Sequence, residues 1–146
     1  MPRRLSERTQ AVIFLVVLGV AIAGLYGWAQ ASQAPPVRSE TVSGVSLVVD
    51  GGGWTIFYGP VTTTNNTAFG LLLEASHRLH FPVAYQYYSL PTGVFVSSIN
   101  GTANTAGGPG WQYWVGTSYG DRAANLYPLA DGSNVTWRYT ADQGGA

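Results

Sequence analysis

The N-terminal part of the chain contains one long uninterrupted apolar segment. Residues 11–29 carry no charge over 19 positions, and as a helix they extend roughly 28 Å at ~1.5 Å per residue. This length is close to the ~30 Å hydrocarbon core of a bilayer. Tyr26 and Trp28 lie near its end, where amphipathic rings favour the membrane interface. The pattern predicts a single transmembrane helix.

Charge around this segment predicts its orientation. Residues 1–10 contain three arginines and one acid, and the next positive charge is Arg38. The positive-inside rule therefore predicts a basic cytoplasmic tail over residues 1–10 and an extracytoplasmic location for everything after residue 30. Residues 11–29 are either an uncleaved signal anchor or a signal peptide cut near Ala31, which would leave a secreted protein. The segment exceeds the usual apolar region of ~7–15 residues in signal peptides, which favours the anchor.

The remainder divides into a spacer, one domain and a short tail. Residues 30–41 are small and polar and contain a Pro-Pro pair, which predicts an extended spacer. The domain is expected over residues 42–142, long enough for one hydrophobic core, with residues 143–146 as a tail.

The domain begins with a pattern typical of a β-hairpin. Residues 44–49 alternate between polar and apolar side chains, and residues 54–58 are rich in aromatic and branched ones. The Asp-Gly-Gly-Gly sequence between them supplies the positive φ angles of a hairpin turn. Gly59 and Pro60 are expected to end the second strand.

One helix is predicted after the hairpin. Asn65, Asn66 and Thr67 are suitable N-cap residues, and residues 68–80 have helical periodicity before Pro82 ends the segment. The side chains expected on the inner face are Phe69, Leu72, Leu73, Ser76 and His80.

Four further strands are expected, giving the order ββ-α-ββ-ββ. They cover residues 83–88, 94–99, 111–115 and 135–140. One helix on a mostly antiparallel sheet is an α+β domain.

Composition excludes several classes of function. The chain has no lysine and no cysteine, and its formal net charge is zero. It therefore lacks a P-loop lysine, a Schiff-base lysine, a thiol nucleophile and cysteine metal ligands. Few arginines and no net charge also argue against a nucleic-acid partner.

Two short motifs suggest chemistry but fit their context poorly. Gly116, Ser118 and Gly120 match the G-x-S-x-G pattern of hydrolases, yet no histidine follows residue 80, so a polar hairpin loop is the favoured interpretation. A hydrolase using Ser118 stays an alternative. Glu74 and the two histidines, His77 and His80, leave most of a metal site unfilled, so we expect no metal centre.

Three asparagines lie in glycosylation sequons. They are Asn65, Asn100 and Asn134, and the predicted outside location makes their modification feasible.

The strand over residues 111–115 carries aromatic rings on both faces. Trp111 and Tyr113 share one face, and Gln112 and Trp114 share the other. One ring set must build the core. The other is either an exposed site for a ligand or partner or the floor of a second packed layer.

From residue 94 onward the sequence resembles a known family. It is similar to the C-terminal β-domain of the cobalamin carriers transcobalamin and intrinsic factor, and still more to the prokaryotic surface domains named after it. The resemblance covers about residues 44–140 and depends on four segments in matching order and spacing: residues 96–101, 111–116, 122–128 and 129–137.

The resemblance implies a β-grasp-like fold, ligand binding and no catalysis. In the carriers the tryptophan strand, which corresponds here to Trp111 and Gln112, lies near the corrin ring, so cobalamin or another corrinoid is the implied ligand. Those carriers close over the vitamin with a large helical domain, which residues 1–41 are too short to form.

These patterns predict a membrane-anchored extracytoplasmic module for binding or interaction, with no enzymatic activity and no resident cofactor. Its site is expected at Trp111, Gln112, Tyr113 and Trp114. The spacer reaches at most ~40 Å at ~3.3 Å per residue, so the partner is expected to be a membrane or cell-envelope protein, or a small ligand. An accessory subunit of a membrane complex fits this arrangement. A corrinoid receptor and a structural envelope protein are the alternatives.

Overall fold

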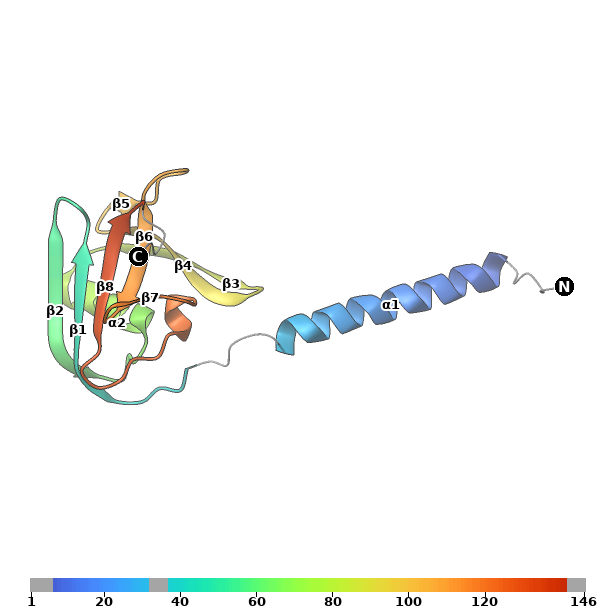
Figure 1. Cartoon of the computed structure of the whole chain (residues 1–146), viewed down its shortest axis with the longest axis horizontal. Coiled ribbons are helices and arrows are strands. Elements are labelled where there is room, and N and C mark those ends of the chain that lie inside the picture. The colour runs from blue at the N-terminus through green and yellow to red at the C-terminus, as the bar shows by residue number, and fades with distance from the viewer. Residues whose placement is uncertain (1–6, 32–36, 142–146) are drawn as a thin grey trace. The chain divides into compact units, whose positions relative to one another are not determined.

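The computed structural model describes residues 7–31 and 37–141, which belong to two separate compact units (Figure 1). The first unit contains one helix and the second contains the folded domain. The first six residues of the predicted cytoplasmic tail, spacer residues 32–36 and the predicted tail over residues 143–146 lie outside the described residues.

Helix α1 (Glu7–Ala31) contains the apolar segment recognised in the sequence. Its window Ala11–Trp28 has a mean hydropathy of 2.3, and its side chains are exposed. The helix is long and apolar enough to cross a membrane or to act as a signal sequence. It begins before the apolar segment because polar residues such as Glu7 can also take helical conformation.

Five strands of the domain form one sheet in the order β2-β1-β8-β6-β7. Strands β1 and β8 pair in parallel at its centre, whereas the other neighbours are antiparallel. The strands are β1 (Val42–Asp50), β2 (Thr55–Thr63), β6 (Gly110–Val115), β7 (Ser118–Tyr119) and β8 (Asn134–Thr140).

A second sheet has the order β3-β4-β5 and is built from β3 (Val83–Ser89), β4 (Thr92–Ile99) and β5 (Thr102–Ala103). The expected single sheet is therefore two sheets. Periodicity identifies strands but not their partners, and β4 pairs with β3 and β5 rather than with β6. The hairpin of β3 and β4 extends away from the five-stranded sheet (Figure 1).

The expected strand end at Gly59 and Pro60 is wrong. Strand β2 continues to Thr63, with a shift of register where these two residues face β1. Proline has no N–H to donate, but β2 is the edge of the sheet and has only one strand neighbour. An edge position therefore allows the strand to pass through Pro60.

Helix α2 (Ala68–Leu79) confirms the predicted helix. The Thr67 hydroxyl accepts a hydrogen bond from the Gly70 N–H at 2.9 Å, and His80 ends the helix in the left-handed conformation. The predicted inner face is only partly correct, because His80 is exposed and Leu73 and Ser76 are half-buried. The buried residues are Ala68, Phe69, Leu71, Leu72 and Ala75.

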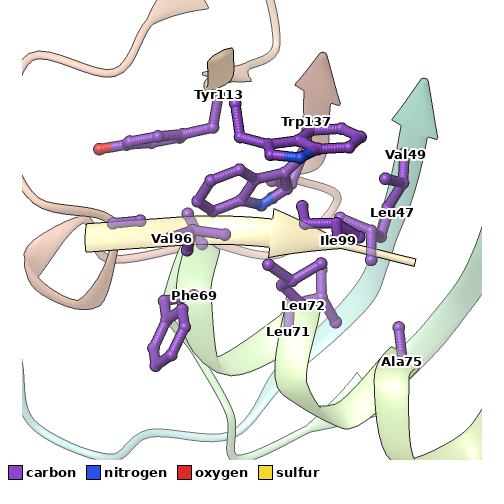
Figure 2. Close-up of a cluster of buried hydrophobic side chains, with 14 of the residues drawn as sticks. Leu47, Val49, Phe69, Leu71, Leu72, Ala75, Val96, Ile99, Tyr113 and Trp137 are labelled. Atoms are coloured by element: carbon purple, nitrogen blue, oxygen red, sulfur yellow. The ribbon is translucent and has the colours of Figure 1, made fainter. Parts of the chain in front are cut away.

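The core lies between the five-stranded sheet, strand β4 and helix α2. Figure 2 shows Leu47, Tyr113 and Trp137 on one side of β4. Leu71 and Leu72 of helix α2 approach β4 from the other side. Each fully buried leucine contributes roughly 1.5–3 kcal/mol relative to an exposed one. A 3-10 turn, η1 (Ala124–Leu126), adds buried Ala124 next to β4 and α2.

Candidate functional site

The structure resolves which face of β6 builds the core. Trp111 and Tyr113 are each 7% exposed and belong to the core cluster. Gln112 and Trp114 lie on the opposite face and are half-buried. The four predicted site residues are therefore divided between the two faces of one strand.

Trp111 is fixed by its indole nitrogen and by two neighbouring rings. Its Nε1 donates to the Thr102 carbonyl oxygen at 2.7 Å, and its ring centroid lies 5.8 Å from that of Trp54 and 5.5 Å from that of Tyr139. Most of its surface is thus used for packing, and only part of the ring is available to a ligand.

Tyr113 is fixed in a similar way. Its hydroxyl donates to the Arg122 carbonyl oxygen at 2.6 Å, and its ring lies 5.3 Å from that of Trp137. Burial raises the pKa of Tyr113, and the nearby charge of Asp121 raises it further. The phenol is therefore a neutral hydrogen-bond donor at physiological pH.

The outer face of the five-stranded sheet carries a row of apolar side chains. Cross-strand pairing places Phe57, Val48, Thr136, Trp114 and Tyr119 in that order across the sheet. Phe57 and Tyr119 are exposed, and the Arg138 guanidinium lies 5.1 Å from the centroid of the Trp114 ring. Tyr119, at one end of this row, also lines the cavities beside β6.

A cavity of about 330 Å³ lies between strands β4 and β6. Three consecutive residues of each strand line it, residues 94–96 and residues 111–113. Consecutive side chains of a strand point to opposite faces of its sheet. A cavity that contacts three consecutive residues of a strand therefore lies along the edge of that strand, and here this holds for both β4 and β6. The remaining walls are Tyr88, Tyr119, residues 120–124 and Trp137.

A second cavity of about 210 Å³ continues along the same edge of β6. It shares Phe95, Trp111, Gln112 and Tyr119 with the first and adds Asn104, Thr105 and residues 108–110. We call the two cavities together the β4–β6 cleft. Three of the four predicted site residues line this cleft, and Trp114 does not.

Two unpartnered polar atoms belong to residues that line the cleft. Oε1 of Gln112 is buried and accepts no hydrogen bond, and Nε1 of Trp137 is buried and donates none. Leaving a buried donor or acceptor unpaired typically costs about 1–3 kcal/mol.

The cleft contains one ion pair at residues 121 and 122. The Arg122 Nε lies 2.8 Å from a carboxylate oxygen of Asp121, and both side chains are exposed. Hydrogen bonding from Arg122 lowers the pKa of Asp121. The two charges compensate each other, so the cleft as a whole is close to neutral.

The G-x-S-x-G motif forms a hairpin. Gly116 adopts a positive φ in the turn after β6, and Ser118 is exposed in β7. A nucleophile elbow requires a helix directly after the serine, whereas here a strand follows the turn. The structure therefore agrees with the hairpin interpretation.

Glu74 belongs to a hydrogen-bonded cluster on one side of α2. Its carboxylate accepts hydrogen bonds from the hydroxyls of Tyr58 and Thr63 and from the side-chain amide of Asn65. Burial alone would raise the pKa of Glu74, but these bonds and the charge of Arg78 lower it below its usual value. Both histidines are exposed, and the described part of the chain contains no group of three or more potential metal ligands.

The three sequon asparagines are exposed. Asn65 lies just before α2, Asn100 lies in the turn after β4, and Asn134 begins β8. The Nδ2 of Asn65 donates a hydrogen bond to the Glu74 carboxylate at 2.7 Å. Glycosylation of Asn65 would attach the glycan to the same nitrogen. Their glycosylation stays a prediction.

Sequence reasoning missed the contribution of β4 and of the loop before β6. Phe95 is exposed between the buried residues Val94 and Val96, and it lines both cavities. The only sign of its exposure in the sequence is its position in a strand where alternate side chains face opposite sides. Nothing in the sequence marks Asn104. Its side-chain amide donates to the Val96 carbonyl oxygen of β4 and accepts from the Trp111 N–H of β6, two strands that do not pair with each other.

A family model described as a domain of unknown function, DUF4430, matches residues 65–141. This range includes α2, the whole second sheet and both walls of the cleft. No curated protein matches the sequence.

Two solved structures are similar to the chain. One is haptocorrin in complex with Cbi, at a TM-score of 0.59 and 17% identity, covering 72% of this chain and 26% of haptocorrin. The other is a protein from Ruminococcus gnavus described as a candidate metal-binding protein, at a TM-score of 0.50 and 12% identity, covering 68% of this chain and 98% of that one.

These matches establish likeness of fold. Together with the family model they support a transcobalamin-like domain. The chain matches only about a quarter of the length of haptocorrin.

Proposed function

The chain belongs to the DUF4430 family, and we propose that it is an extracytoplasmic binding module anchored to a membrane by α1, which engages its ligand or partner in the β4–β6 cleft. Membership names no activity, so the proposal is based on the cleft and on the properties of α1.

The observation that carries the proposal is the open cleft beside Trp111, Gln112 and Tyr113. A well-packed domain normally closes such a gap. Here the gap is lined by aromatic rings, and the lining residues Gln112 and Trp137 carry the unpartnered polar atoms. Aromatic walls with a few polar groups are typical of ligand sites.

The membrane anchor is supported by the composition and charge of the N-terminal segment. Helix α1 contains an apolar window of 18 residues, and the arginines of residues 1–10 precede it. The positive-inside rule then places the N-terminus in the cytoplasm and the domain outside. A cut near Ala31 would release the same domain as a secreted protein.

The assignment of the domain to the β-grasp type is part of the proposal. It is supported by the central parallel pair of β1 and β8, by the antiparallel strands on either side, and by α2 packed against one face.

A corrinoid is the second candidate ligand. The supporting observation is the similarity of the domain to haptocorrin, whose structure contains Cbi. The cleft here is small and partly open, so a large ligand would be only partly enclosed, and we expect weak binding by this chain alone.

Two exposed phenylalanines allow a matched test of the cleft. Phe95 lines both cavities, whereas Phe57 lies on the outer face of β2 and lines neither. A photoreactive phenylalanine analogue would replace each in turn in the full chain in its native membrane. We expect a discrete crosslinked adduct from position 95 and none from position 57.

The corrinoid candidate has its own test with the same pair. Cobalamin and related corrinoids would be titrated into the full chain in detergent, followed by tryptophan fluorescence corrected for absorption. Saturable quenching that weakens in Phe95→Ala but not in Phe57→Ala would support corrinoid binding. Failure of both the crosslink and the quenching would overturn the cleft as a binding site.

The absence of cysteine makes the topology directly measurable. A single cysteine at exposed Ser118 should react with a membrane-impermeant maleimide on intact cells, and protection until lysis would contradict the proposed orientation. Intact mass of the purified protein would show whether the chain is cut near Ala31. A structural envelope protein instead predicts self-association, which sedimentation of the full chain would detect.

A further inference from the structure

The β3–β4 hairpin exposes apolar side chains at its turn. Tyr87 is 64% exposed, Leu90 is 55% exposed and Tyr88 is 41% exposed. Tyr87 and Tyr88 are consecutive in β3 and therefore point to opposite faces, and Leu90 lies in the turn itself. We call these three residues the hairpin tip. Exposed apolar side chains that gather in one place are typical of a contact with a partner or a membrane.

The hairpin lies in an uncharged part of the chain. Residues 81–120 contain no Asp, Glu, Lys or Arg. The hairpin tip therefore has no charged group that would lose its hydration on entering an apolar environment. It also offers no charge of its own to a partner of opposite sign.

Aromatic packing holds the hairpin against the domain. The Phe69 ring of α2 is buried, and its centroid lies 4.9 Å from that of Tyr85 and 6.1 Å from that of Tyr87. The centroids of Tyr85 and Tyr87 are 5.6 Å apart. The exposed rings are thus already ordered, so a contact at the tip would cost little conformational entropy.

The tether between helix α1 and the domain is short. Nδ2 of Asn66 donates to the Arg38 carbonyl oxygen at 2.9 Å, so the domain holds the chain from Arg38 onward. Helix α1 ends at Ala31, and the seven residue steps from Ala31 to Arg38 reach at most about 25 Å at ~3.6 Å per residue. A domain of about 100 residues has a radius of gyration of roughly 13 Å, which corresponds to a sphere roughly 33 Å across. With α1 in a membrane, as proposed above, one side of the domain therefore stays close to the lipid surface.

The tether and the hairpin belong to the same side of the domain. Figure 1 shows that the segment of residues 37–41 begins on the side away from β2, the side toward which the β3–β4 hairpin extends. The side of the domain that the tether keeps near the lipid thus carries the hairpin tip.

We propose that the hairpin tip inserts into the headgroup layer of the membrane that holds α1. This inference rests on the membrane anchor of the proposed function. Tyrosine rings favour this layer because they combine an apolar ring with a polar hydroxyl. Lipid can surround the tip, whereas a protein partner with a single surface would cover Tyr87 or Tyr88 but not both faces. Because Tyr88 also lines the β4–β6 cleft, insertion would fix that end of the cleft at the lipid surface.

The absence of cysteine allows a matched pair of labelled chains. A single cysteine would replace Leu90 or, as the control, Phe57, which is 71% exposed on β2. Each full chain would carry a polarity-sensitive fluorophore at that cysteine and would be reconstituted, one chain per disc, in phosphatidylcholine nanodiscs. We expect the emission from position 90 to shift to shorter wavelength and to be lost when part of the lipid carries a nitroxide on its acyl chain. The emission from position 57 should stay that of a fluorophore in water.

A second pair of variants separates the tip from the label. Tyr87→Asp places a carboxylate beside the label at position 90, and taking a carboxylate out of water is unfavourable. This change should reverse both the wavelength shift and the quenching. Phe57→Asp introduces the same charge at an equally exposed site and should leave both unaltered. Neither Tyr87 nor Phe57 lines the cleft, so the proposed ligand site is unchanged in both variants.

The outcomes separate this inference from the proposed function. If the chain stays in the nanodisc and position 90 reports water, insertion is overturned while the anchor and the cleft stand. A shift that appears only in the native membrane, without nitroxide quenching, would also overturn insertion and would assign the tip to a protein partner. If the chain is not retained in the nanodisc, the membrane anchor fails and this inference fails with it.

Discussion

Gly120 lies directly against the phenol ring of Tyr113, where a Cβ atom at position 120 would overlap the ring carbons. The two residues are also joined by the hydrogen bond from the Gly120 N–H to the Tyr113 carbonyl oxygen at 2.9 Å. The packing of Tyr113 therefore explains why the last position of the G-x-S-x-G motif is glycine, without any catalytic role for Ser118. It allows the chain after β7 to close over the end of the cleft.

We expect Gly120→Ala to destabilise the domain by about 1–3 kcal/mol, because the added methyl group must displace a buried ring. Urea unfolding followed by tryptophan fluorescence measures this. Gly53→Ala is the control, since a Cβ there meets nothing within 4 Å. Equal stability of Gly120→Ala and the wild-type chain would contradict the packing.

Most elements could be predicted from local patterns. The hairpin of β1 and β2, helix α2 with its Thr67 cap and the strands β3, β4, β6 and β8 all follow from periodicity, turn residues and capping. The course of β2 past Pro60 could not, because it depends on β2 being an edge strand. The short strands β5 and β7 were missed because two residues show no periodicity.

The geometry of the candidate site could be predicted only in part. The rings of β6 identified the strand, and the structure places Trp111, Gln112 and Tyr113 beside the cleft. Which face is buried depends on the partner of β6 and on the position of α2, and neither is encoded locally. The opposite wall, with Phe95, arises from the separation of two sheets, which a linear pattern does not reveal.

Trp111 and Trp114 should respond differently to truncation. Trp111 is 7% exposed and packs in the core, so Trp111→Ala should cost about 3–5 kcal/mol. Trp114 is half-buried on the outer face, where Trp114→Ala should cost clearly less. Loss of ligand binding in Trp111→Ala would thus be hard to separate from unfolding, and Phe95→Ala is the better probe. Equal costs for both tryptophans, measured by urea unfolding, would contradict the assigned faces.

Glu74 should make stability depend on pH. Its pKa is lowered in the folded state, so the folded state favours the carboxylate. The stability it contributes is therefore complete above its unfolded pKa of about 4.5 and is lost as the pH falls through the lowered native pKa.

The measurement is the free energy of unfolding in urea from about pH 7 down to about pH 3, a range that covers the carboxyl titration of the unfolded chain. Glu74→Gln should cost about 1 kcal/mol at neutral pH, and this cost should shrink as the pH falls below the unfolded pKa. The exposed Glu40 offers Glu40→Gln as the control, with a curve parallel to that of the wild-type chain. A constant difference between Glu74→Gln and wild type at every pH would show that the carboxylate charge does not matter.

Asn104 should be more important to the cleft than its position in a loop suggests. Asn104→Ala leaves the Val96 carbonyl and the Trp111 N–H without their partner, so we expect a cost of about 1–3 kcal/mol. Asn104→Asp keeps the acceptor for Trp111 but places a carboxylate oxygen against the Val96 carbonyl, so it should not restore stability. Hydrogen exchange measured by mass spectrometry should show faster exchange at the Trp111 amide in Asn104→Ala than in Asn104→Asp. Equal protection in both variants would mean that Asn104 does not bridge the two edges, and the open gap between β4 and β6 would then need another explanation.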